Sequence, residues 1–256
     1  MRIAGTRIDR VAAVPAAHDM PEWERTWPAR IRRRPQRSDG NYLLLSALVD
    51  SLVEARDRHV PEGSSMLDVG CGDKPYYPLF AAASEYIGAD VVDGPKVDVV
   101  CPLEALAFPD ARFDTVLCSQ VLEHVRAPVV ALREIARVLR PSGVLLASTH
   151  GTYPYHPHPT DYWRWTQDGL RALFDDAGGF EIVDVVPHRG SIACLALLVS
   201  NYIEMAATSA GLRWLGRPIV GAINTMGAAL DGRVARLQYP GPHTLVANFL
   251  VVARRV

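Results

Sequence analysis

Leu67-Asp68-Val69-Gly70-Cys71-Gly72-Asp73 decides the fold: a short apolar run from residue 65 ends in a turn built on two glycines. The run predicts a buried β-strand, and a second run, residues 86–89, predicts another that ends in Asp90. A glycine turn lets a ligand approach the backbone, and a carboxylate ending the next strand can accept hydrogen bonds from both hydroxyls of a ribose. The pattern therefore predicts an α/β domain that binds a nucleoside at the carboxyl ends of its strands.

Strands and helices alternate along the rest of the chain. A helix is expected from the glycine turn to about residue 83, and Thr166 is expected to cap another. Further strands are expected at residues 97–100, 113–118, 144–149, 181–186 and 244–253, and further helices at 41–59, 127–139 and 168–177. Apolar strands that alternate with helices predict a seven-stranded, mostly parallel sheet covered by helices on both faces.

Two segments fall outside this alternation. Residues 1–40, rich in proline and arginine, are expected to form an N-terminal arm on the domain of residues 41–256, or a lid over its site. Residues 188–243 are expected to form a helical insertion before the last strand, with helices near 191–207 and 215–237. The apolar side chains of the insertion are open to four interpretations: cover for the sheet or for each other, a homodimer face, a lid over a greasy acceptor, or a membrane-surface contact.

Composition excludes several classes of protein. The chain has 256 residues and a formal net charge of −1, which argues against a polycationic nucleic-acid binder. No run of about 18 uncharged apolar residues predicts a spanning helix, and no export signal is evident. The cysteines, Cys71, Cys101, Cys118 and Cys194, lack metal-ligand spacing, so we expect reduced thiols and a cytoplasmic protein.

Charge at the glycine turn distinguishes two nucleoside ligands. A dinucleotide site favours a third glycine where this chain has Pro75, and Asp68, two residues before the first glycine, would repel a pyrophosphate. The same carboxylate suits a ligand that carries an ammonium and a sulfonium. The turn therefore favours S-adenosylmethionine and disfavours an NAD(P)-dependent oxidoreductase.

Several motifs extend this interpretation into a family resemblance. Residues 64–187, with the last strand, resemble class I S-adenosylmethionine-dependent methyltransferases of the type 11 small-molecule branch, which have a Rossmann-like fold. The matching motifs are Leu67–Gly72, the acid Asp90, the segment Leu106–Asp114 that leads into the fourth strand, the motif Gln120-Val121-Leu122-Glu123-His124-Val125 that follows this strand, and the turn Leu139–Gly143.

The resemblance implies roles for individual residues. It implies cofactor binding by Asp68, Gly70, Cys71 and Gly72 at the methionine portion, by Asp90, Val91 and Leu103 at the ribose and adenine, and by Ser119 and Gln120 at the methyl-donor pocket. The family's adenine-binding acid is replaced by Pro102. Adenine recognition would then depend on the backbone near Leu103 or on another acid, such as Asp98.

The catalytic candidates follow the fourth and fifth predicted strands, because ligands in this fold bind beyond the carboxyl ends of the strands. His150 and His158 lead as a general base, since histidine titrates near working pH, and His124 is a third candidate that packing alone also explains. Metal binding by His156, His158 and Asp161 is disfavoured by the stiffness of the His-Pro-His sequence, so no metal is expected.

The segment Pro159–Leu170 resembles a sequence motif of methyltransferases that are encoded among cell-surface glycan genes. By that analogy, His156, Asp161, Tyr162, Trp163 and Arg164 would bind the acceptor. The expected function is O-methylation of a carbohydrate, glycolipid or other small hydroxylated metabolite. A non-catalytic cofactor-binding or interaction protein is the alternative, and a nucleic-acid methyltransferase is disfavoured because the chain lacks a basic face.

Overall fold

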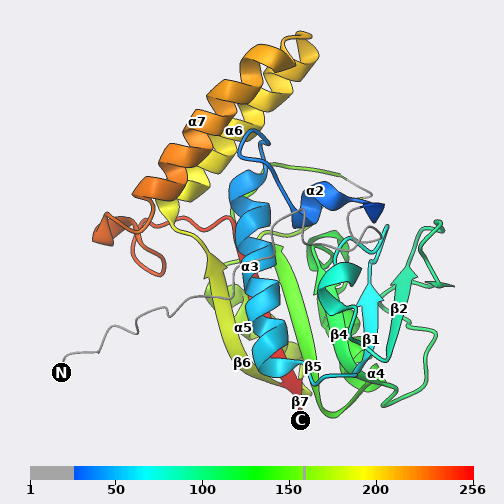
Figure 1. Cartoon of the computed structure of the whole chain (residues 1–256). Helices are drawn as coiled ribbons and strands as arrows, with labels where there is room; N and C mark the ends of the chain where they lie inside the picture. The colour runs from blue at the N-terminus through cyan, green and yellow to red at the C-terminus, as the bar shows by residue number, and fades with distance from the viewer. Residues whose placement is uncertain (1–25, 158–159) are drawn as a thin grey trace.

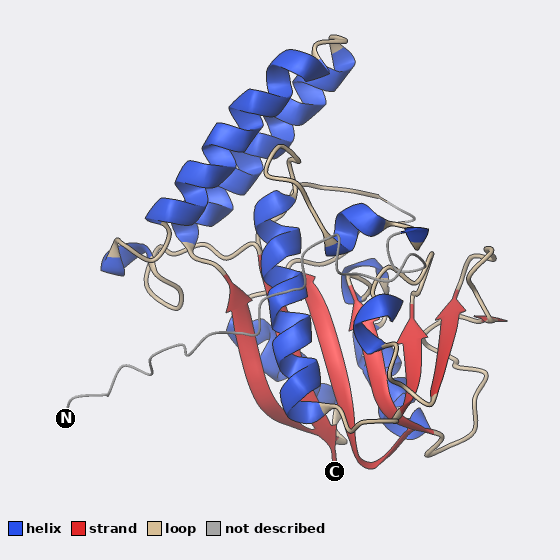
Figure 2. Cartoon of the chain, in the orientation of Figure 1, coloured by secondary structure: helices blue, strands red, loops and turns tan. Residues whose placement is uncertain are grey.

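The computed structural model describes residues 26–157 and 160–256, and its centre is one seven-stranded sheet (Figures 1 and 2). The strands are β1 (Ser65–Val69), β2 (Glu85–Asp90), β3 (Val99–Val100), β4 (Phe113–Ser119), β5 (Leu139–His150), β6 (Phe180–His188) and β7 (Asn248–Arg255). Their order is β3-β2-β1-β4-β5-β7-β6, and only β7 runs antiparallel to its neighbours. The predicted mostly parallel α/β sheet is confirmed.

Helices cover both faces of the sheet, as the alternation predicted. On one face, α3 (Tyr42–His59) packs Leu48 and Leu52 against Met66 of β1 and Leu146 of β5. On the other face lie α4 (Pro128–Val138) and α5 (Gln167–Ala177), whose apolar side chains join a second core cluster. The central strands are therefore buried on both sides, which explains their continuous apolar runs.

The structure corrects two local predictions. The helix expected after the glycine turn is a single 3-10 turn, η1 (Tyr77–Phe80), because Pro75 and Pro78 remove backbone donors that a longer helix would need. The turn expected at residues 140–143 instead belongs to β5, which begins at Leu139 opposite Phe113. The cap is confirmed: the Thr166 side chain accepts a hydrogen bond from the Gly169 N–H at 3.0 Å.

The described part of the N-terminal arm lies over the glycine loop. It contains a short helix, α2 (Arg30–Arg33). Arg33 is buried and donates to the carbonyl of Pro75 at 2.6 Å, and the Trp27 indole donates to the carbonyl of Lys74 at 2.9 Å. These contacts fix the outer surface of the loop. The division at residue 40 stays a prediction.

The insertion forms a helical hairpin that projects past the sheet (Figure 1). Its helices are α6 (Ser191–Ser209) and α7 (Arg213–Leu230), followed by η3 (Ala235–Leu237), so α7 ends earlier than the sequence predicted. Gly216 and Gly227 let the helices approach closely, because a Cβ there would lie 2.5 Å from Ala207 and 2.6 Å from Ala196. By length and composition alone, α6 would suffice to cross a membrane.

Candidate methyl-transfer site

The loop after β1 requires both of its glycines. Gly70 has φ +64° and Gly72 has φ +47°, left-handed values that side chains disfavour. A Cβ on Gly70 would also lie 2.4 Å from the Val121 side chain, so a larger residue there would force Val121 to shift. The Gly72 N–H donates to Asp90 Oδ2 at 2.9 Å, and the Val92 N–H donates to Oδ1 at 3.0 Å. The acid at the end of β2 is therefore held beside the loop.

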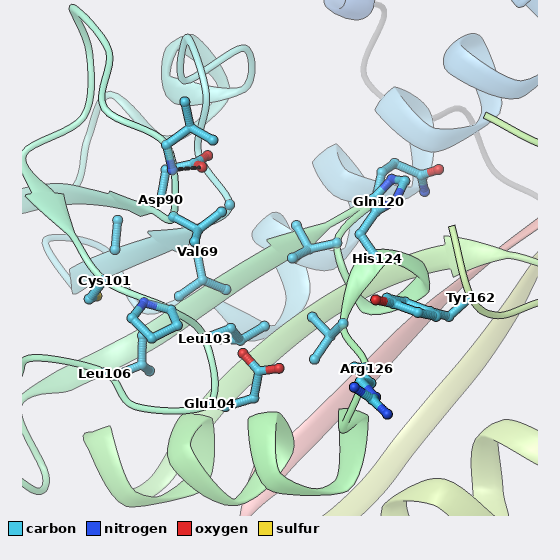
Figure 3. Close-up of a pocket in the computed structure, with 17 residues that line it drawn as sticks. Val69, Asp90, Cys101, Leu103, Glu104, Leu106, Gln120, His124, Arg126 and Tyr162 are labelled. Atoms are coloured by element: carbon cyan, nitrogen blue, oxygen red, sulfur yellow. Dashed lines mark hydrogen bonds between the residues drawn. The ribbon is translucent and has the colours of Figure 1, made fainter. Parts of the chain in front are cut away.

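Two cavities of about 610 and 590 Å³ meet at this loop. Gly70, Gln120 and His124 line both of them. The first cavity extends between the end of β2 and the segments at 101–106 and 120–126 (Figure 3). The second extends from the loop toward β5, α2 and α6. All nine residues predicted to bind the cofactor line one cavity or the other.

The first cavity holds Asp90, Val91 and Leu103, together with two residues that the sequence analysis missed. Glu104 and Arg126 both line it and are labelled in Figure 3. Asp98, the suggested substitute for the missing adenine-binding acid, does not line it. Its carboxylate instead accepts from the Gly88 N–H at 2.7 Å and pairs with Lys74. Besides Asp90, Glu104 is therefore the acid that lines this cavity.

The second cavity holds Asp68, Cys71, Gly72 and Ser119. Asp68 is 4% exposed and accepts from the Tyr86 hydroxyl at 2.7 Å, and its burial raises the pKa of the carboxyl to about 7. The cavity is also lined by polar residues from distant segments that the sequence analysis did not assign: Arg32, Asn41, Tyr153 and Glu204. Their separation in sequence explains why no local pattern showed them.

Three histidines gather at the wall of the second cavity. The His156 ring lies 4.9 Å from that of His124 and 5.0 Å from that of His150, between centroids. His150 is buried and stacks on Tyr153 at 4.1 Å, and burial holds its pKa well below the ordinary value. His124 Nδ1 contacts the carbonyl of Thr160. Because a carbonyl only accepts, that contact places the proton of neutral His124 on Nδ1 and leaves Nε2 as the base nitrogen.

Glu123 lies behind these histidines. It is fully buried, accepts from the Thr149 hydroxyl at 2.8 Å, and has Oε1 3.4 Å from His150 Nε2. Burial raises the pKa of Glu123 to about 7. A buried carboxyl next to a buried imidazole is most stable with both groups uncharged, so burial favours the protonated carboxyl of Glu123 and the neutral imidazole of His150.

The loop that carries the predicted acceptor residues is held mainly by its own contacts. Arg164 donates to both carboxylate oxygens of Asp161 at 2.5 and 2.6 Å, and the Trp163 indole donates to the carbonyl of Val125 at 2.8 Å. Asp161, Trp163 and Arg164 line neither cavity, whereas His156 lines the second and Tyr162 the first. Acceptor binding by the five residues stays a prediction, and His158 lies outside the described residues.

Metal-ligand atoms come together in two overlapping sets. Glu123, His150 and His156 form one, and His124, His156 and Asp161 form the other, with the atoms of each set within 4.8 Å of one another. The guanidinium of Arg164 already neutralises Asp161 and lies 3.3 Å from His156 Nδ1. We assign no metal to either set, because that fixed cation opposes a second one.

Comparison with known proteins agrees with this geometry. Residues 67–147 match the family model described as a methyltransferase domain. Residues 67–147 thus belong to an S-adenosylmethionine-dependent methyltransferase domain. The cofactor of this methyltransferase domain is S-adenosylmethionine, and the two joined cavities fit it: one has apolar walls and a carboxylate, and the other has a glycine loop and a buried carboxylate.

Relatives extend the likeness over part of the chain. A Mycobacterium tuberculosis protein named "Probable S-adenosylmethionine-dependent methyltransferase" is 31% identical over 134 residues, 46% of this chain and 49% of the relative. A Cereibacter sphaeroides ubiquinone biosynthesis O-methyltransferase is 34% identical over 119 residues, 39% of this chain and 47% of the relative. This chain thus matches about half the length of these curated relatives.

Solved structures share the fold at low identity. The [4+2]-cyclase SpnF aligns with a TM-score of 0.54 and 22% identity, covering 81% of this chain and 80% of that one. A Burkholderia thailandensis 1,6-didemethyltoxoflavin-N1-methyltransferase, with 1,6-didemethyltoxoflavin and S-adenosylhomocysteine bound, aligns with a TM-score of 0.51 and 19% identity, covering 90% of this chain and 80% of that one. These structures bear on the fold of the methyltransferase domain alone.

Proposed function

We propose that this protein transfers a methyl group from S-adenosylmethionine to a hydroxyl of a small acceptor, a carbohydrate or glycolipid or another hydroxylated metabolite, held in the second cavity. The observation that carries the proposal is the position of His124, which lines both cavities where they meet. A group at that junction reaches both the cofactor and the acceptor.

The cofactor-binding residues divide between the two cavities. We assign the ribose to Asp90, since Gly72 and Val92 hold its carboxylate in place while each oxygen retains a free lone pair. The adenine fits the walls at Val91 and Leu103, with Glu104 available to its amino group. The ammonium of the methionine portion fits the carboxylate of Asp68, and Gly70, Cys71, Gly72, Ser119 and Gln120 enclose the rest.

The chemistry requires alignment and one proton acceptor. Bound S-adenosylmethionine supplies a methyl group on a positively charged sulfur. As the acceptor oxygen bonds to that carbon and the carbon–sulfur bond breaks, the hydroxyl proton passes to His124 Nε2, which leaves an ether and a neutral thioether. The Thr160 carbonyl stabilises the imidazolium that results. We place His124 ahead of His150, whose lowered pKa makes it a weaker base.

The polar wall of the second cavity supports a hydroxylated acceptor. Arg32, Asn41, Tyr153 and Glu204 provide both hydrogen-bond donors and acceptors. Free buried cysteines are in keeping with a cytoplasmic location, which we also propose. The alternative, a non-catalytic cofactor-binding protein, would need no base at the junction of the cavities.

Labelled cofactor and fractionated cell extract test the proposal. The protein is incubated with methyl-labelled S-adenosylmethionine and with lipid, polysaccharide and small-molecule fractions, and S-adenosylhomocysteine is measured. We expect acceptor-dependent turnover and an alkali-stable label, as an ether gives. Cofactor binding without turnover on any fraction would favour the non-catalytic alternative, and label on nitrogen or carbon would refute O-methylation.

A further inference from the structure

The hairpin of α6 and α7 carries an unpartnered apolar face. On α6, one side contacts α7 through Ser200, whose hydroxyl donates to Asn224 at 3.0 Å, and the adjoining side contacts the 36–40 segment, where Glu204 accepts from the Gly40 N–H at 2.8 Å. On α7, Arg217 donates to Gln36 and Ser38 of the same segment. Each helix therefore packs one side against the other helix and an adjoining side against the 36–40 segment.

The opposite side of the hairpin is exposed and apolar. Residues spaced by three or four positions share one side of a helix, and they give one exposed stripe on each. These are Leu195, Val199 and Tyr202 on α6, and Leu215, Ile219, Met226 and Leu230 on α7, each 44–61% exposed. We call these seven residues the outer face. Because the two antiparallel helices contact the 36–40 segment on the same side, both stripes lie on the other side, next to each other.

No charged residue belongs to the outer face. Between residues 191 and 230 the charged residues are Glu204, Arg213 and Arg217, and two of these contact the 36–40 segment. Two helices of 19 and 18 residues extend about 28 Å, at 1.5 Å per residue. An uncharged apolar face of that length has a high cost in water, so we expect something to cover it.

The edges of the hairpin indicate what covers the outer face. Its tip carries Arg213 and Trp214, the latter 70% exposed, and Arg233 and Arg236 follow its base, all exposed. Within the described residues, none of these arginines has an acidic partner, and Asp231 is bound to the N–H groups of Gly190 and Ala193. The edges are thus basic, with an exposed tryptophan of the kind enriched at membrane interfaces.

We propose that the outer face docks on an anionic lipid surface, with the hairpin lying in the interface and its arginines at the headgroups. A second copy of the chain fits less well, since a two-fold axis sets the same basic edges against each other with no acid to pair them. An anionic leaflet complements them instead. Docking itself does not depend on the proposed function.

The second cavity relates this surface to the site. Arg32 of α2 and Glu204 of α6 both line that cavity, and Figure 1 shows α2 and the hairpin at the same end of the sheet. Because Glu204 lies on the side of α6 opposite the outer face, an acceptor carried in the lipid surface would pass the edge of the hairpin to enter this cavity. This step, unlike docking, rests on the proposed function and favours a glycolipid among its acceptors.

Vesicle flotation with the full chain tests docking. Vesicles of phosphatidylcholine alone are compared with vesicles that contain about 30% phosphatidylglycerol. We expect the protein to float with the anionic vesicles, and the double variant Val199→Asp/Ile219→Asp to lose about tenfold or more of that binding. The matched control is Val130→Asp on α4, which exchanges an apolar side chain of similar exposure (42%, against 49% for Val199 and 50% for Ile219) and should bind as the original chain does.

Further measurements separate the rival outcomes. Replacing Arg213 and Arg233 by Ser should weaken flotation and reduce its salt dependence. Cofactor binding measured by calorimetry should be equal in all variants, which distinguishes failure of docking from failure of the site. Docking is refuted if the original chain floats with neither vesicle or equally with both, or if the double variant floats undiminished. A dimer that the double variant converts to a monomer, without flotation, would assign the outer face to a second copy.

Discussion

The backbone N–H of Gly72 donates to Oδ2 of Asp90 at 2.9 Å, joining the loop after β1 to the end of β2. A nucleoside needs a backbone without side chains to approach and a carboxylate in a fixed position. This hydrogen bond holds the two features next to each other. Gly72 also has a left-handed backbone, so the same residue makes the turn and binds the carboxylate.

Replacing Asp90 tests its assignment to the ribose. We expect Asp90→Ala to weaken S-adenosylmethionine binding about thirtyfold or more, because hydrogen bonds to a charged group contribute about 2 kcal/mol. Asp90→Asn should lose less, since its amide oxygen still accepts from Gly72. Calorimetric titration measures both, with the exposed Asp93→Ala as control. Equal affinities in Asp90→Ala and Asp93→Ala would contradict the assignment.

Affinity for the cofactor should depend on pH through Asp68. Its pKa is raised to about 7, and only the carboxylate attracts an ammonium, so affinity should rise with pH up to about 7. Because binding would release one proton, the affinity should rise by up to about tenfold per pH unit between pH 5 and 6.5. Asp68→Asn should bind weakly with a flat profile in this window. A profile as steep as that of the original chain would show that another group titrates.

Glu123 should lower the stability of the ligand-free protein as pH rises. Its pKa of about 7 when folded exceeds the ordinary 4.5, so the folded state binds the extra proton, and stability is lost between those two values. Glu123→Gln keeps the acceptor for Thr149 and cannot ionise. The free energy of unfolding of Glu123→Gln, relative to that of the original chain, should therefore rise by up to about 3 kcal/mol between pH 4.5 and pH 8. Urea unfolding at both pH values measures this gain, and an unchanged difference would contradict it.

His124 should affect turnover and leave cofactor binding intact. Removal of a general base typically costs about a hundredfold or more in kcat. We expect that loss for His124→Gln, once an acceptor is found, with an unaltered Kd for S-adenosylmethionine. His59→Gln, at the far end of α3, is the matched control. A normal kcat in His124→Gln would remove it from the catalytic role and return His150 and His158 to consideration.

The two loop glycines should differ in their tolerance of a methyl group. Gly70→Ala and Gly72→Ala both force an L-residue to positive φ, at about 1–2 kcal/mol. Only Gly70→Ala also places a Cβ against Val121, whereas nothing lies within 4 Å at Gly72. Thermal unfolding should therefore show the larger loss for Gly70→Ala. Equal losses would mean that Val121 yields without cost.

The sequence by itself determined the sheet, the glycine loop, the acid at Asp90 and the nature of the cofactor. Those features depend on residues that are near each other in the chain: apolar runs of strand length, glycines at a turn, and an acid at a strand end. The main local error, the helix after the loop, lay where Pro75 and Pro78 shorten a regular pattern.

Only the tertiary structure decided what surrounds the reacting groups. Arg32, Tyr153 and Glu204 line one cavity although they lie in different quarters of the sequence, because the sheet and the hairpin bring α2, the loop after β5 and α6 to one end of the molecule. Only the structure likewise showed that Asp161 and Arg164 form an ion pair with each other, although the sequence suggested both for acceptor binding. Which side of α6 and α7 stays exposed depends on the 36–40 segment, whose position no periodicity in those helices reveals.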